Sequence, residues 1–284
     1  MKLTVKLLIL LLCCYGTARF CHHQTSGFRI SKIRGNYLEQ MDFLEDPLTK
    51  QKDALLQGKF TYFGRGLQSF AFLSEDGAYV LKIFNNKMQK KRAFFKTFGF
   101  LNKAQETENK LKLTFESYKI AYEELKQETG ILYTHLKPTS TLQRTVTLID
   151  KLGIAHPLDL DTTGFVLQKR ATLAYPYLKD LIEKGALLEA KSAITALTHL
   201  FIQKSLKGIK DNDPLIRTNL GFINHKPIHI DIGPFSKDPE VQDPKFYLPE
   251  IRRITASLKN FLENNCPELI LHLENELKNV EKSY

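Results

Sequence analysis

One stretch of sequence decides the predicted fold: Lys210-Asp211-Asn212-Asp213-Pro214-Leu215-Ile216-Arg217-Thr218-Asn219. An apolar stripe from Ala190 to Phe201 predicts a core-facing helix before it. A hairpin is expected after it, with strands at 220–223 and 228–232 around a turn at 224–227. His225 and His229 flank this turn, where solvated side chains are the usual outcome. The second strand ends in His229-Ile230-Asp231-Ile232-Gly233. The chain therefore runs through helix, acidic loop, asparagine, hairpin and Asp-x-Gly, in that order.

Four side chains of this series carry carboxylate or amide oxygens. Asp211 and Asp213 lie in the loop, Asn219 closes it, and Asp231 opens the Asp-x-Gly. A lone Asp-Ile-Gly is usually only a turn at the end of a strand, so the meaning of Asp231 depends on what lies upstream.

Upstream, short apolar runs predict a three-stranded meander at 59–63, 70–74 and 78–84. Glu75-Asp76-Gly77 between the last two is a tight-turn signal, because Asp-Gly supplies the positive φ that a hairpin needs. The third strand carries Lys82. A lysine on such a strand is ordinarily a solvated side chain.

The first turn of the meander is rich in glycine: Phe63-Gly64-Arg65-Gly66-Leu67-Gln68-Ser69. Glycine lets backbone N–H groups approach a phosphate without a Cβ in the way. A meander of this length places Lys82 near the turn. Two glycines alone predict only a hairpin, and the lysine and the downstream acids are what favour phosphate binding.

In this order the features resemble the protein kinases, over roughly 60–235. The resemblance implies that a glycine-rich loop binds ATP through Gly64 and Gly66, with Ser69 at the place of a third glycine. Lys82 would be the lysine that pairs with the α- and β-phosphates.

The resemblance also requires a helix glutamate that pairs with the strand lysine. Residues 85–130 are predicted to be helical, and Glu116 and Glu123 are the leading candidates there. Residues 168–171 would be the hinge that meets the adenine. The other candidate glutamates are Glu106, Glu108 and Glu124.

By the same resemblance, Asn219 and Asp231 would hold Mg²⁺. Asp213 would orient or deprotonate the acceptor hydroxyl, with Asp211 as the other candidate.

The expected fold is α+β with two kinase-like lobes: a small antiparallel-sheet N-lobe with a helical insertion, and a reduced helical C-lobe. A lead-in and the N-lobe would occupy 19–170, with further strands at 146–149 and 164–167 and a loop holding His156-Pro157 between them. The C-lobe would occupy 171–284.

Departures from the kinase pattern leave two functions open. The pattern His-Arg-Asp-x-x-x-x-Asn places asparagine five residues after aspartate, whereas Asn219 lies six after Asp213 and no His-Arg precedes it. Ile232 replaces the phenylalanine of Asp-Phe-Gly. We expect either an ATP-dependent phosphotransferase acting on a protein or small-molecule hydroxyl, or a pseudokinase that serves as a binding module.

The N-terminus has the pattern of a secretory signal. Lys2 and Lys6 precede an apolar run, and Gly16-Thr17-Ala18 then offers the small residues that a signal peptidase reads. We therefore expect residues 1–18 to be cleaved and the protein to be secreted or periplasmic. An uncleaved membrane anchor is the alternative. Residues 19–55 show no period and predict a loosely structured lead-in.

A net charge of +10 favours anionic partners such as nucleotides, phosphorylated substrates or acidic membrane surfaces. No nucleic-acid motif accompanies the charge, so no nucleic-acid partner is expected. The basic and aromatic run at 87–100 is compatible with peripheral contact to an acidic membrane, although its aromatic spacing favours packing against the sheet. Cys266 is the one cysteine in the predicted folded body, so no disulfide framework is expected.

Overall fold

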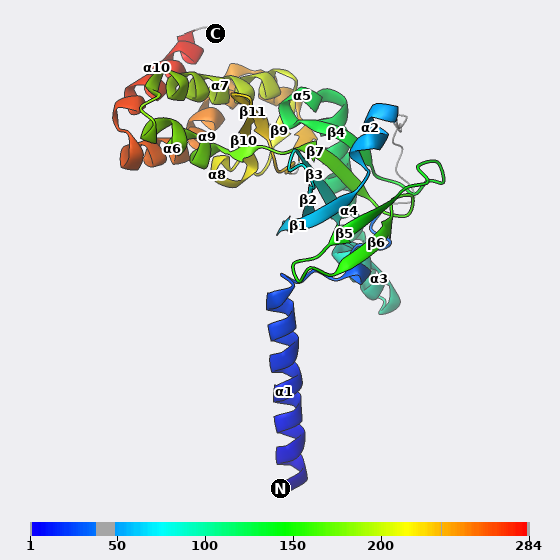
Figure 1. Ribbon diagram of the computed structural model, residues 1–284. Coiled ribbons are helices and arrows are strands. Elements are labelled where there is room, and N and C mark those ends of the chain that lie inside the picture. The colour runs from blue at the N-terminus through cyan, green and yellow to red at the C-terminus, as the bar shows by residue number, and fades with distance from the viewer. Residues whose placement is uncertain (1, 38–48, 234, 283–284) are drawn as a thin grey trace. The chain divides into compact units, whose positions relative to one another are not determined.

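A computed structural model describes residues 2–37, 49–233 and 235–282 (Figure 1). Helices and strands both contribute, which confirms the α+β class. The chain forms two compact units. The first contains Met1–Glu108 and Tyr133–Leu167, and the second contains Asn109–Leu132 and Gln168–Tyr284. The chain therefore passes into the second unit at the start of the 168–171 segment, and most of the long predicted helix groups with that unit.

A seven-stranded sheet dominates the first unit, in the order β4-β7-β3-β2-β1-β5-β6. Neighbouring strands β1 and β5 run parallel, while β1–β2, β2–β3 and β5–β6 are antiparallel. The sheet is therefore mixed, and the expectation of a purely antiparallel sheet is wrong. Its strands are β1 (Lys59–Arg65), β2 (Ser69–Ser74), β3 (Tyr79–Phe84), β4 (Ile131–His135), β5 (Thr145–Ile149), β6 (Ala155–Asp159) and β7 (Phe165–Lys169).

The predicted meander is confirmed as β1, β2 and β3. At the turn between β2 and β3, Gly77 has a φ of +69° and its N–H donates to the carbonyl of Ser74 over 2.9 Å. The Asp76 carboxylate accepts hydrogen bonds from the Ser74 hydroxyl and the Ala78 N–H. Asp-Gly therefore forms this turn for the reason that the sequence indicates.

The predicted loop around His156-Pro157 is wrong, because both residues lie in β6 at the edge of the sheet. Proline lacks an N–H, and an edge strand tolerates that loss. Asp150 closes the preceding turn by accepting from the N–H groups of Leu152 and Ile154. The short strand β4 at the opposite edge was not predicted.

The lead-in is also more ordered than its sequence indicates. Phe28 is buried among the rings of Phe70 and Phe72, and Ile33 is fully buried. The Asn36 side chain donates to the carbonyls of Phe84 and Gly164 and accepts from the N–H of Gly164. Phe28, Ile33 and Asn36 therefore belong to the core of the first unit. The helices of this part of the chain, η1 (Ile30–Lys32) and α2 (Lys50–Leu55), have no buried residue. Residues 38–48 of the predicted lead-in lie outside the described residues.

The predicted helical region consists of α3 (Lys87–Thr97), α4 (Leu101–Glu124) and α5 (Lys126–Thr129). Helix α4 buries the apolar stripe that its spacing predicts, namely Leu111, Phe115, Tyr118, Tyr122 and, just beyond its end, Leu125. Helix α3 buries no residue. The expectation that its aromatic rings pack against the sheet is therefore wrong for Phe94, Phe98 and Phe100, which are all at least half exposed.

The second unit has a helical core (Figure 1). Its long helices bury one apolar face each, including the predicted stripe of α7, from Ala190 to Phe201. Cys266 is buried between α9 and α10, as expected of a packed residue. The helices are α6 (Ala174–Glu183), α7 (Leu187–Leu206), α8 (Ile216–Asn219), η2 (Pro239–Gln242), α9 (Pro244–Asn265) and α10 (Glu268–Lys282).

Five short strands accompany these helices: β8 (Thr172–Leu173), β9 (Ile209–Asp211), β10 (Leu220–Ile223), β11 (Lys226–His229) and β12 (Phe235–Lys237). The predicted hairpin is present as β10 and β11, but its turn is shorter than predicted and its second strand ends at His229. Asn224 and His225 alone form the turn, both with positive φ, and Ile223 pairs with Lys226. Two such residues match the twist of a hairpin better than a longer loop.

Helix α1 (Lys2–Gln24) contains an apolar stretch, Thr4–Gln24, that is long enough to cross a membrane. The stretch is not buried in the structure. A signal sequence and a membrane anchor both have these properties, and helix α1 is compatible with either.

Candidate functional site

In the first unit, the glycine-bearing turn joins β1 to β2. The N–H of Gly66 donates to the carbonyl of Ser69 over 2.9 Å, and a bulge in β1 lies between Tyr62 and Gly64. A Cβ placed on Gly64 would meet no atom within 4 Å. The space next to Gly64 is therefore open, as a phosphate-binding turn requires.

Lys82 lies on β3, where it pairs with Ala71 of β2. Only 8% of this lysine is exposed, so it differs from the solvated lysine that a strand ordinarily carries. Burying an ammonium group is costly unless it has anionic company. Among the residues expected to bind the nucleotide, Gly64, Gly66, Ser69 and Lys82 all belong to the β1–β2–β3 meander.

In the second unit, the loop that follows β9 carries the predicted acids. Strand β9 pairs with β12, so that Asp211 lies opposite Phe235. This pairing brings the start of the acidic loop next to the segment that follows Asp231. Gly233 fits closely here, since a Cβ on it would lie 3.4 Å from Cβ of Asp213 and 3.5 Å from Oδ1 of Asp211.

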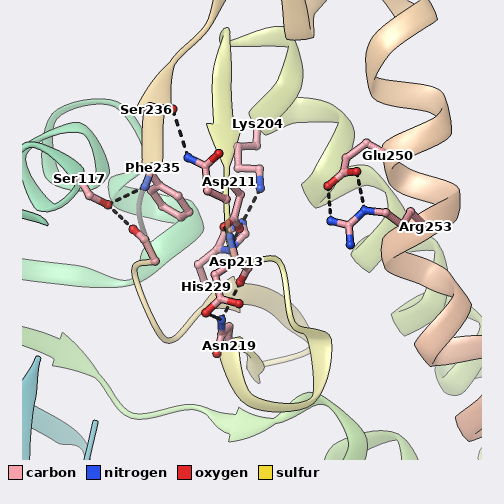
Figure 2. A network of polar contacts seen from close by, with 12 residues as sticks. Ser117, Lys204, Asp211, Asp213, Asn219, His229, Phe235, Ser236, Glu250 and Arg253 are labelled. Carbon is pink, nitrogen blue, oxygen red and sulfur yellow. Dashed lines mark hydrogen bonds and ion pairs between the residues drawn. The ribbon is translucent and has the colours of Figure 1, made fainter. Parts of the chain in front are cut away.

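Asn219 joins the acidic loop to the Asp-x-Gly segment (Figure 2). Its Nδ2 donates to the backbone carbonyl of Asp213 over 2.7 Å, and its own carbonyl accepts from the N–H groups of Ile230 (2.7 Å) and Asp231 (3.3 Å). Asn219 is 5% exposed. Because its amide nitrogen bonds inside the loop, its Oδ1 is the atom left to serve as a ligand.

The two loop aspartates have different surroundings. The side chain of Asp211 is 5% exposed; its Oδ2 forms an ion pair with Nζ of Lys204 over 3.0 Å, and its Oδ1 accepts from the N–H of Asp213. Asp213 itself is exposed. Burial lowers the pKa of Lys204, and the Asp211 carboxylate opposes that shift. Asp211 therefore supports the loop, while Asp213 is accessible.

His229 is buried beside this ion pair, and the expectation of a solvated histidine is wrong. Its Nδ1 lies 3.7 Å from Oδ2 of Asp211, and neither ring nitrogen makes a hydrogen bond among the described residues. Burial, with a smaller contribution from Lys204, lowers the pKa of His229 to about 3. The ring is therefore neutral near pH 7 and packs edge-on against Phe235.

Helix α4 contacts the Asp-x-Gly segment through Ser117, a residue that the sequence did not single out. The Ser117 hydroxyl donates to the carbonyl of Gly233 and accepts from the N–H of Phe235 (Figure 2). The neighbouring Tyr118 is buried, and burial together with the charge of Asp231 raises its pKa. Glu116, the predicted partner of Lys82, is exposed on the same helix.

Among the described residues, no group of three or more His, Cys, Asp or Glu side chains could hold a metal ion. Asn219 and Asp231 are the two oxygen ligands that the sequence predicts. Such a pair fits Mg²⁺ only where nucleotide phosphates and water complete the coordination. This donor set suits a metal that arrives with its nucleotide, and it does not suit a resident all-protein metal site.

A cavity of about 360 Å³ lies beside the loop within the second unit. Lys204, Asp211 and Asn212 line one side of it, and Glu250 and Arg253 of α9, which form an ion pair, line another (Figure 2). Apolar side chains, including Phe246 and Tyr247, also contribute to the lining. The cavity can therefore receive a small molecule that is partly charged and partly apolar.

Comparisons with models of known protein families and with curated proteins gave no match to this chain.

Proposed function

We propose that this chain is a kinase-like protein that binds ATP with Mg²⁺ and transfers the γ-phosphoryl group to a hydroxyl of a protein or small molecule. The observation that supports the proposal most strongly is the connection made by Asn219. One side chain fastens Asp213, and the backbone of the same residue accepts from the N–H of Asp231. A kinase-type site needs its metal ligands and its acceptor aspartate held together in this way.

In the proposed site, the turn carrying Gly64 and Gly66 offers backbone N–H groups to the phosphates, and Lys82 supplies a positive charge. Asn219 and Asp231 would hold Mg²⁺, which would supply positive charge for the phosphate oxygens. Glu116 remains the proposed partner of Lys82.

Asp213 is the proposed acid/base residue. The acceptor oxygen attacks the γ-phosphorus, the bond to the bridging oxygen of ADP breaks, and the acceptor proton passes to the Asp213 carboxylate. Asp213 suits this role because its side chain is exposed. The buried ion pair with Lys204 makes Asp211 a positioning residue, because the N–H of Asp213 donates to its Oδ1.

The alternative function is that of a pseudokinase that binds a partner or a small ligand without transferring phosphate. Two observations favour it: the six-residue offset between Asp213 and Asn219, and the cavity that borders Asp211 and Asn212. In this alternative the loop supports a binding site and no turnover occurs.

ATP turnover by the full-length protein distinguishes the two functions. We expect Asp213→Ala to lower Mg²⁺-dependent formation of ADP from ATP by about 100-fold or more, the usual contribution of a positioned acid/base group, while ATP binding is retained. The matched control is Asp180→Ala, which removes an exposed aspartate on α6. Full activity in Asp213→Ala would refute the assigned role, and a wild-type protein that binds ATP without turning it over would establish the pseudokinase.

We further propose that helix α1 directs export, as a cleaved signal or, alternatively, as a membrane anchor. Its apolar stretch from Thr4 to Gln24 supports both. Mass spectrometry of the protein from its native source decides between them. A mature chain beginning near Arg19 supports cleavage, and an intact N-terminal segment supports the anchor.

A further inference from the structure

Helix α3 presents an unusual surface, because it is basic and aromatic and most of its residues are exposed. It contains no buried residue. Phe94, Phe98 and Phe100 are 54%, 62% and 51% exposed, and Leu101, the first residue of α4, is 66% exposed. A cluster of exposed large apolar side chains indicates a surface that contacts a membrane or another protein. We call Phe94, Phe98, Phe100 and Leu101, with the basic residues around them, the α3 patch.

Basic residues outnumber acidic ones around these rings, although Arg92 of α3 forms an ion pair with Glu108 of α4 at 3.7 Å. No aspartate or glutamate occurs between Gly77 and Gln105. The basic residues of α3 and the start of α4 are Lys87, Lys90, Lys91, Arg92, Lys96 and Lys103. Lys91 and Lys103 lie over the ring of Phe95 at 5.5 and 5.9 Å, and Lys103 also lies 5.5 Å from the ring of Phe100. Lysine ammonium groups and phenylalanine rings thus lie together on one surface. Such a surface is complementary to a partner that is anionic and partly apolar.

The structure also fastens α3 to the chain that leaves the apolar helix α1. Asn86, the residue before α3, donates from its side chain to the carbonyls of Ser31 and Arg34 over 2.9 and 2.6 Å, and its N–H donates to the carbonyl of Lys32. Nζ of Lys90 donates to the carbonyl of Ser31. The start of α3 therefore contacts Ser31 and Arg34, which follow the end of α1 at Gln24 after a short stretch of chain.

The connecting chain has the same electrostatic character. No acidic residue occurs between Met1 and Leu38, whereas Arg29, Lys32 and Arg34 lie between α1 and the contacts with α3. Two acid-free segments thus meet at one place, next to the one apolar helix among the described residues that is long enough to cross a membrane.

We propose that the α3 patch binds the surface of an anionic lipid bilayer, with the phenylalanine rings in the headgroup region and the lysines on the lipid phosphates. A bilayer explains both parts of the surface, because basic side chains gain from anionic headgroups and apolar rings gain from the acyl boundary. The proposal is independent of ATP binding. Either fate of α1 is compatible with it, since the patch lies outside that helix.

The chain contains no tryptophan, so one introduced tryptophan reports on one site. The test is the full-length variant Phe98→Trp in vesicles of phosphatidylcholine with or without phosphatidylglycerol, each prepared with brominated acyl chains as the quencher. We expect blue-shifted emission and strong quenching in the anionic vesicles, and little of either in phosphatidylcholine alone. Leu188→Trp places the reporter on α7, at a leucine that is 76% exposed, and should show no quenching in either vesicle.

The charge requirement is tested by adding Lys87→Gln, Lys91→Gln and Lys96→Gln to the reporter variant. Each basic charge near an anionic surface contributes about a fivefold gain in binding, so most of the quenching should be lost. A matched triple on the second unit, Lys179→Gln, Lys184→Gln and Lys191→Gln, should leave it unchanged. Circular dichroism of both triples checks that they fold.

Several outcomes would overturn the proposal. Equal quenching in the two kinds of vesicle would show that anionic lipid is not what the patch selects. An absence of quenching in both would remove the bilayer as the partner. A blue shift that depends on protein concentration, without quenching by lipid, would show that the patch covers a second copy of the chain.

Discussion

The side-chain amide of Asn219 donates to the backbone carbonyl of Asp213 over 2.7 Å, and this bond closes the acidic loop of the second unit. Both residues come from a stretch whose sequence predicts a kinase-type loop. Asn219 therefore contacts Asp213 although six residues, and not five, separate their positions in the sequence. The short helix α8 takes up the intervening chain.

Asn219→Asp should weaken the loop, because it removes the donor to the Asp213 carbonyl and places a second carboxylate near Oδ2 of Asp213, now 3.4 Å from Nδ2. The Asp213 carbonyl still accepts from the N–H of Leu215 over 2.9 Å, so the loss is that of one hydrogen bond, about 0.5–1.5 kcal/mol of stability. Urea unfolding followed by circular dichroism measures the change. Asn212→Asp, at an exposed position of the same loop, is the control and should stay within about 0.5 kcal/mol of wild type.

The ion pair between Lys204 and Asp211 should show strong coupling. Lys204→Met keeps most of the aliphatic stem but leaves the Asp211 carboxylate buried without its partner, which costs about 3–5 kcal/mol. Combining it with Asp211→Asn should cost much less than the sum of the single changes. A double-mutant cycle by urea unfolding measures this coupling, and additive effects would contradict it.

The control for that cycle is Lys207→Met, which breaks a more exposed ion pair with Glu128. Exposed pairs contribute at most about 1 kcal/mol. If Lys207→Met lowered the free energy of unfolding as much as Lys204→Met does, burial would not be the reason for the large contribution of the Lys204 ion pair.

Stability should fall in mild acid because of His229. The pKa of His229 is about 3 in the folded protein and 6.5 in the unfolded chain. Between these two values, His229 is protonated in the unfolded chain and neutral in the folded protein. The stability that neutral His229 permits is therefore complete above pH 6.5 and decreases as the pH falls toward about 3. At pH 5 the loss is about 2 kcal/mol relative to pH 7.

His229→Phe should remove this loss, because phenylalanine packs in the same place without a proton to bind. We expect its advantage over wild type in urea unfolding to be about 2 kcal/mol larger at pH 5 than at pH 7. His199→Phe changes an exposed histidine and is the control. Parallel pH profiles for wild type and His229→Phe would show that the buried ring does not govern acid stability.

Local patterns predicted the parts of the fold that local chemistry decides. The Asp76-Gly77 turn, the strands of the meander and the apolar stripe of α7 are all present. Strand β6 was missed because a proline usually breaks a strand, and only its position at the edge of the sheet permits it. The ordered structure of the lead-in could not be predicted from local patterns. It depends on hydrogen bonds from the Asn36 side chain to the carbonyls of Phe84 and Gly164, which lie far along the chain.

The site shows the same division. The sequence singled out Asp211, Asp213, Asn219 and Asp231 by residue type and order. It gave no signal for Ser117 and Lys204, because a serine or lysine in a helix is ordinary until tertiary contacts place it beside a loop. The burial of His229 was missed for a related reason: strand β11 ends there, so its side chain faces the core and not the turn.

We propose that the chain binds ATP with Mg²⁺ and that Lys82 and Asp231 each contribute to this binding. The most direct test is a thermal-shift titration of the full-length protein with ATP, with and without Mg²⁺. A ligand at 100 times its Kd stabilises the folded state by about 2.7 kcal/mol, so wild type should show a clear Mg²⁺-dependent rise in Tm. Lys82→Met should weaken the rise at every ATP concentration, and Asp231→Asn should remove its dependence on Mg²⁺.

Lys59→Met on β1 and Asp180→Asn on α6 remove an exposed lysine and an exposed aspartate and should behave as wild type. We expect loss of the ATP effect in Lys82→Met and of the Mg²⁺ effect in Asp231→Asn, with both controls unchanged from wild type. A wild-type Tm that ATP and Mg²⁺ leave unchanged, or a rise that survives in both variants, would contradict it.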